Sequence, residues 1–111
     1  MTLIDVRDAL LTVTQKVYHF SPPKDATGSY IVWAEDGQAS AKHGNNRMQE
    51  QALTGTVDYY TKIEYDPVVQ QIQKAMSDAG IPWRLESIQK EDATGYIHYE
   101  WVFEMVVDPH G

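Results

Sequence analysis

The strongest constraint on the fold is the regular alternation of side chains in the last long segment, residues 96–107. In a β-strand, residues two apart share a face. One face of this segment would carry Ile97, Tyr99, Trp101, Phe103, Met105 and Val107. The other would carry Tyr96, His98, Glu100, Val102, Glu104 and Val106. The pattern predicts a long strand with one face covered by other elements and a second, more polar face.

Two amphipathic helices are predicted, and we expect them to cover the apolar face of this strand. Residues 3–17 repeat apolar side chains every three or four positions after a candidate N-cap, Thr2. The second helix has stronger end signals: Asp66 as its cap, Pro67 in its first turn, and Gly80 as its left-handed final residue. Its buried stripe would consist of Val68, Val69, Ile72, Ala75, Met76 and Ala79.

Two further strands are predicted from runs of β-branched and aromatic residues at 30–34 and 53–63, and a third is placed at 84–90. The last of these forms a hairpin with 96–107 through the turn at 91–95. Because strands and helices do not strictly alternate, we predict an α+β fold. It is a mixed, mostly antiparallel four- to five-stranded sheet with two helices packed on one face, in a single domain spanning residues 1–111.

A polar segment of 17 residues, 35–51, interrupts the predicted sheet. Its only large apolar side chain is Met48, so it buries too little surface to offset the entropy of fixing its backbone. We expect this loop to be mobile in the free subunit and to become ordered against a partner. Lys42, Arg47 and Glu50 would then form ion pairs across the contact.

Composition excludes several classes of function. The chain has no cysteine, which removes disulfides and thiolate metal sites and suits assembly in a reducing cytoplasm. Its net charge is −7, and the nearest thing to a basic cluster is Lys42, His43 and Arg47. We therefore expect no binding of DNA or RNA. No run of about 18 apolar residues and no signal-peptide pattern is present, which predicts no membrane segment.

No enzymatic or cofactor motif is found. His98 and Glu100 lie two apart on one strand and point the same way, as two metal ligands could, but no histidine spacing supplies the third ligand. Asp58 and Glu64 could form a carboxylate pair, yet nothing in the sequence brings them together. We therefore predict no catalytic, cofactor or metal site, and interpret His98 as a polar residue of the wetter face or of a subunit contact.

The aromatic residues carry more information: three Trp, seven Tyr and two Phe. Trp33, Trp101 and Phe103 fit a core. Alternation places Tyr60 opposite Tyr59, and Tyr96 opposite the apolar face of its strand, so large side chains lie on both faces of the sheet. Such a surplus favours a protein–protein surface, and Tyr60, Tyr96 and His98 are its candidate residues.

The order of these patterns resembles the small tail terminator or tail completion proteins of long-tailed bacteriophages and prophages, also labelled minor capsid or tail-component proteins. The resemblance rests on aromatic strand patterns in order, namely 30–33, 57–62, the capped helix ending at 79–81, 92–99 and Phe103. It implies a non-enzymatic virion protein, assembled in the bacterial cytoplasm, that forms a homohexameric ring at the head–tail junction. Its partners would be other copies of itself, the tail tube protein and the head connector, with DNA passing through unbound.

A second hypothesis remains open on the residues alone. The chain would be a cellular α+β module that binds a small molecule, or a small enzyme, with a pocket near His98 and Trp101. Oligomeric state separates the two hypotheses, because the first expects hexamers and the second a monomer or dimer.

Overall fold

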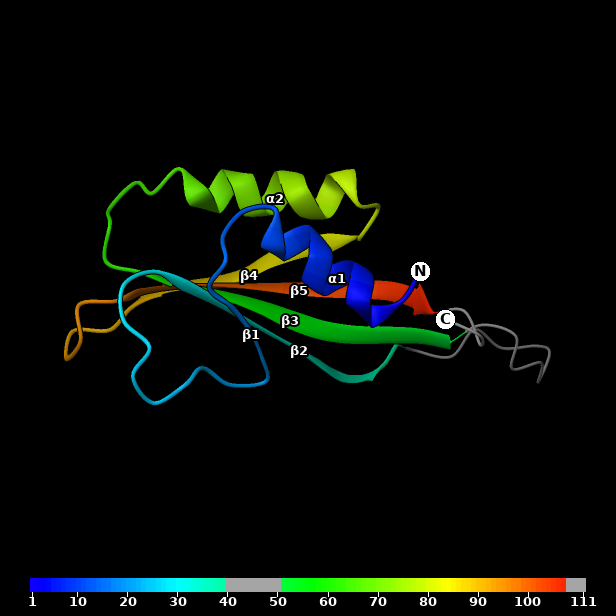
Figure 1. Cartoon of the computed structure of the whole chain (residues 1–111), viewed down its shortest axis with the longest axis horizontal. Coiled ribbons are helices and arrows are strands. Elements are labelled where there is room, and N and C mark those ends of the chain that lie inside the picture. The colour runs from blue at the N-terminus through cyan, green and yellow to red at the C-terminus, as the bar shows by residue number, and fades with distance from the viewer. Residues whose placement is uncertain (40–50, 108–111) are drawn as a thin grey trace.

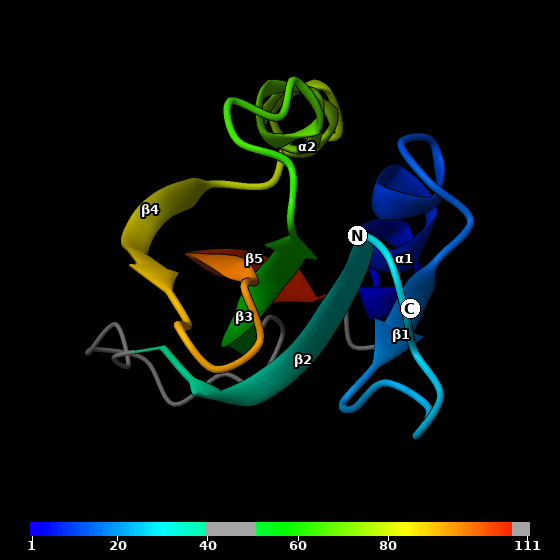
Figure 2. The same ribbon diagram turned by 90° about the vertical axis from the view of Figure 1, so that its left-hand side faces the viewer.

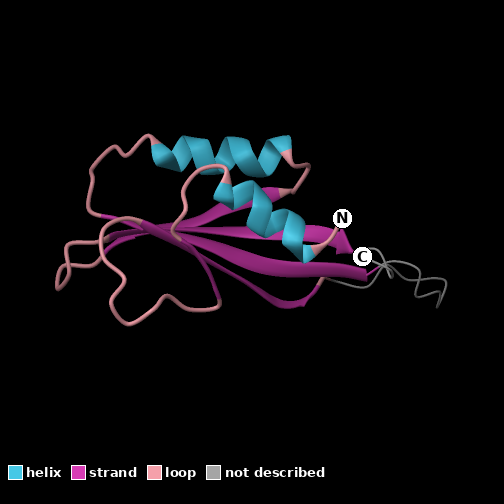
Figure 3. Cartoon of the chain, viewed as in Figure 1, coloured by secondary structure: helices cyan, strands magenta, loops and turns pink. Residues whose placement is uncertain are grey.

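The computed structural model describes residues 1–39 and 51–107, and it is a five-stranded sheet with two helices on one face (Figures 1 and 3). The helices are α1 (Leu3–Leu11) and α2 (Val68–Asp78). The strands are β1 (Val17–His19), β2 (Tyr30–Gln38), β3 (Gln51–Thr61), β4 (Trp83–Lys90) and β5 (Ile97–Val107). Their order in the sheet is β1-β2-β3-β5-β4, with β1 parallel to β2 and the other pairs antiparallel. The predicted fold class is confirmed.

The centre of the sheet is the pair β3 and β5, which run side by side from Gln51 opposite Val107 to Thr61 opposite Ile97. Viewed along the strands, the sheet curves beneath α2 and α1 (Figure 2). The face toward the helices holds the core, and the predicted core residues Trp33, Trp101 and Phe103 are all buried there. The Trp101 indole Nε1 donates to Gln73 Oε1 of α2 at 3.1 Å, which links the central strand to the helix above it.

Asp66 joins the end of β3 to the start of α2. Its Oδ1 accepts the Val68 N–H at 3.0 Å, which is the predicted capping contact. Its Oδ2 accepts hydroxyl hydrogen bonds from Tyr59 at 2.8 Å and Thr61 at 2.7 Å. Burial raises the pKa of Asp66, but the hydrogen bonds from Val68, Thr61 and Tyr59 outweigh it and hold that pKa below its ordinary value.

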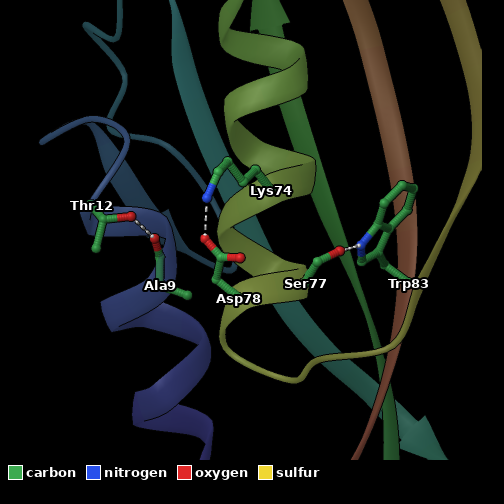
Figure 4. A network of polar contacts seen from close by, with 6 residues as sticks. All are labelled: Ala9, Thr12, Lys74, Ser77, Asp78 and Trp83. Carbon is green, nitrogen blue, oxygen red and sulfur yellow. Dashed lines mark hydrogen bonds and ion pairs between the residues drawn. The ribbon is translucent and has the colours of Figure 1, made fainter.

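The other end of α2 also follows the prediction. Gly80 has φ +76°, and the Ile81 N–H donates to the Met76 carbonyl at 2.9 Å, as in a left-handed helix end. Beyond it, the Trp83 Nε1 of β4 donates to Ser77 Oγ at 2.8 Å, so the last turn of α2 is tied to the edge of the sheet (Figure 4).

The first helix is shorter than predicted. The expected helix at 3–17 ends at Leu11, and Val17 begins β1 instead. Thr12 Oγ1 bonds back to the Ala9 carbonyl at 2.6 Å, and the β-branched residues after it disfavour further helix (Figure 4). Pairing with β2 gives residues 17–19 a strand ladder in its place. Neither helix of the described ranges is long and apolar enough to cross a membrane.

The predicted loop at 35–51 is too long at both ends, because β2 continues to Gln38 and β3 begins at Gln51. A register shift between Glu35 and Gly37 accommodates Asp36, whose Oδ1 accepts a hydrogen bond from Thr54 Oγ1 at 3.0 Å. Pairing with β3 gives hydrogen-bond partners to the backbone groups of residues 35–38, so these polar residues form strand although they bury little apolar surface.

Gly55 is a buried position where neighbouring atoms leave no room for a side chain, and it supplies a test of the β2–β3–β5 packing. A Cβ at Gly55 would lie 2.4 Å from the Ala34 carbonyl oxygen and 2.5 Å from the Phe103 ring. We expect Gly55→Ala to lower the free energy of unfolding by about 1–3 kcal/mol, because neither the backbone nor a buried ring can yield cheaply. Gly37→Ala, whose Cβ meets only Thr54 Oγ1 at 3.6 Å, is the matched control in chemical denaturation. Equal losses would contradict this packing.

Asp66 supplies a second test, through pH. We expect Asp66→Asn to lower the free energy of unfolding at pH 7 by about 1–3 kcal/mol, since it removes a charged acceptor shared by three donors. A carboxylate with a lowered folded-state pKa stabilises the fold above its unfolded pKa of about 4, and this contribution is lost as the pH falls through the folded value. The difference between variant and wild type should therefore shrink toward pH 2. Asp78→Asn, at an exposed pair with Lys74, is the control and should change little.

Candidate functional site

The face of the sheet opposite the helices carries two neighbouring rows of side chains from four adjacent strands. Each row holds one residue from each of β2, β3, β5 and β4, which are named below in that order. The first row is Tyr30, Tyr60, His98 and Gln89, and the second is Val32, Asp58, Glu100 and Ser87. We call this surface the open face.

Aromatic rings cover one end of the open face, and we call Tyr18, Tyr30, Tyr60, Tyr96 and His98 the tyrosine cluster. The Tyr60 ring stacks between Tyr30 and His98, with centroids 5.0 and 4.4 Å away. Tyr96 meets both Tyr30 and Tyr60 edge to face, and Tyr18 meets Tyr30 in the same way. These contacts connect four segments distant in sequence into one rigid surface.

Two hydroxyls of this cluster, those of Tyr60 and Tyr30, have raised pKa values and stay protonated across the physiological range. Burial, and then the nearby carboxylate of Asp58, raise the pKa of Tyr60 to about 12. Burial, followed by Tyr96 and Glu91, also raises the pKa of Tyr30. Lys62 Nζ lies 4.8 Å from the centre of the Tyr96 ring, close enough for a cation–π contact. The centre of the tyrosine cluster therefore offers the neutral phenol groups of Tyr30 and Tyr60.

A polar cluster adjoins the rings. His98 Nε2 lies 2.7 Å from Asp58 Oδ1, with both side chains less than one-fifth exposed. Ligand atoms of Asp58, His98 and Glu100 all lie within 4.8 Å of one another. The sequence argument against a metal site rested on the missing third residue beside His98 and Glu100. Asp58, on the neighbouring strand, occupies that position.

The predicted interface residues divide into two groups. Tyr60, Tyr96 and His98 are brought together in the tyrosine cluster. Lys42, Arg47, Met48 and Glu50 lie outside the described residues, so the predicted contacts of the polar loop stay predictions. The pocket of the alternative hypothesis would need His98 and Trp101 on one face, but His98 lies on the open face and Trp101 is fully buried on the helix side.

Sequence reasoning missed Tyr18, Tyr30 and the meeting of Asp58 with His98. A signal was present for Asp58. Once Tyr60 is set opposite His98, the antiparallel register requires Asp58 to lie opposite Glu100. No such signal existed for Tyr18, because a three-residue parallel strand leaves little trace in the sequence.

Exposed apolar side chains lie near both edges of the sheet. On the edge strand β4, Leu85 is 40% and Ile88 is 56% exposed. Phe20 directly follows the other edge strand, β1, and is 61% exposed with φ +73°. The His19 ring stacks on both Phe20 and Trp33, with centroids 4.0 and 4.1 Å away. The chain therefore carries exposed apolar side chains near both edges of the sheet.

The chain has matches among solved structures but not among sequences. No protein-family model and no curated protein matches the sequence. Among solved structures, the chain is similar to a chain from the virion of a native gene transfer agent particle, with a TM-score of 0.60 and 19% identity. The match covers 93% of this chain and 91% of that one, so the two share a fold over nearly their whole lengths.

Proposed function

We propose that this chain is a structural protein of a phage-like virion, and that it acts there as a tail terminator or tail completion protein. Six copies would form a ring that caps the tail tube and joins it to the head connector. The observation that carries the proposal is the likeness in fold to a chain of a gene transfer agent virion over 93% of this sequence. The resemblance of its aromatic strand pattern to tail terminators points to the same class of particle.

The two edges of the sheet support ring formation. A cyclic assembly of identical subunits joins two different patches of each copy, which meet head to tail. The β4 edge with Leu85 and Ile88, and the β1 end with Phe20, are two such patches on opposite sides of one sheet. An edge strand with free backbone groups can also pair with a neighbouring chain.

The charge of the chain supports a passive passage for DNA. A ring of six copies carries a formal charge of six times −7, or −42. An acidic lining repels the phosphate backbone and would prevent DNA from adhering while it moves through. On this proposal the chain needs no catalytic group, and its contacts with other proteins are its function.

Ring formation is tested by mass measurement of the purified chain in solution and by electron microscopy. We expect hexameric rings from the wild type, and smaller species from Ile88→Asp, because a buried charge at the subunit contact is costly. Ile63→Asp is the matched control, since Ile63 is 57% exposed and follows β3, the middle strand of the sheet, rather than an edge strand. A wild type that stays monomeric or dimeric at every soluble concentration, and that forms no ring on tail tubes, would favour the cellular module instead.

DNA binding is tested by gel mobility shift. We expect the chain to retard duplex DNA no more than serum albumin does at moderate salt, since its nine Lys and Arg residues are outnumbered by sixteen acids. A salt-sensitive shift at micromolar protein would contradict the passive passage.

A further inference from the structure

The polar cluster on the open face has the composition and geometry of a metal-binding site. Asp58 on β3, and His98 and Glu100 on β5, direct ligand atoms to within 4.8 Å of one another. The two strands are the central pair of the sheet and are bonded along their full lengths, so the backbone under the cluster is fixed. The His98 ring is held by stacking on Tyr60, with 15° between their planes. Little rearrangement would be needed to bring these ligands around one ion.

The charge of the cluster also calls for a cation. Asp58 and Glu100 lie directly opposite each other on adjacent strands, an arrangement in which like charges destabilise the sheet. In the described part of the chain, no lysine or arginine forms an ion pair with either carboxylate. His98 offsets at most one negative charge. A divalent ion would offset both.

A third observation comes from the next strand of the same row. Ser87 lies opposite Glu100 in the register, and its Oγ is buried without a hydrogen-bond partner among residues 1–39 and 51–107. Buried hydroxyls almost always have a partner, and exceptions often mark the place of an ordered water or ion. On the strand next to Glu100, such a hydroxyl suits a water molecule held by a bound metal.

We propose that Asp58, His98 and Glu100 bind one divalent transition-metal ion, with Zn²⁺ as the best match. One imidazole nitrogen and two carboxylate oxygens are ligands that Zn²⁺ accepts, and the remaining position is left to water or to a group from another molecule. On binding, His98 Nε2 gives up its contact with Asp58 and bonds the ion as neutral imidazole, so acid should weaken binding. This site is independent of the proposed place in a virion.

The test is titration of the purified full-length chain with ZnCl₂ by calorimetry at pH 7.5, after treatment with EDTA. We expect one equivalent of Zn²⁺ to bind per subunit. His98→Gln and Glu100→Gln should each weaken binding at least about tenfold, because each removes a direct ligand and the loss of even a hydrogen-bond partner of a ligand costs about that much. His19→Gln is the matched control: His19 also pairs with a carboxylate, Glu35, but belongs to no three-ligand cluster in the described ranges, so its variant should bind as the wild type does.

Nuclear magnetic resonance of the histidine ring nitrogens gives a readout on the folded wild type that needs no variant. Addition of Zn²⁺ should move the Nε2 resonance of His98 and leave that of His19 unchanged. The proposal is overturned if the His98 resonance does not move, if His98→Gln binds as tightly as the wild type, or if Glu100→Gln retains full affinity. In these outcomes the cluster is only a hydrogen-bonded histidine–carboxylate pair.

Discussion

The register of β3 against β5 is the constraint on which the rest of the structure depends. Side chains alternate between faces, so a shift of one residue would move every side chain of β3 to the wrong face relative to β5. Tyr59 would then leave the core and Tyr60 would enter it. Gly55 helps to fix the register, because its missing side chain leaves the space that the Phe103 ring fills. The core under the helices and the polar cluster on the open face are two results of one alignment.

Much of this fold could be predicted because its signals are local. The alternation in 96–107, Asp66 before α2 and Gly80 after it each act within a few residues of the element they define. The additional role of Asp66 was not predictable in the same way. Its hydrogen bonds from Tyr59 and Thr61 depend on where β3 ends relative to the helix, which is a tertiary property.

The errors share a physical cause, which is that backbone pairing overrides local pattern. The apolar repeat at 3–17 continues the period of a helix. Val17 nevertheless pairs with Ile31 of β2, so strand hydrogen bonding overrides its place in the helical repeat. The polar residues after Glu35 bury little and still form strand, because β3 supplies their hydrogen bonds. The third candidate ligand was missed for a similar reason, since spacing along one strand could not reveal Asp58 on the next. Contacts across strands depend on the register, which no local pattern specifies.

The surfaces proposed for ring contacts and for ion binding lie on different strands of the sheet. A ring whose subunits meet through β4 and the β1 end would bury the two edges of the sheet, where Ile88 and Phe20 are exposed in the single chain. The polar cluster lies on the two central strands, away from both edges. Such a ring would therefore leave the open face uncovered, with its tyrosine hydroxyls and any bound ion available to a different partner. Substitutions at Ile88 and at His98 should then act independently, because the two residues share neither an interface nor a ligand.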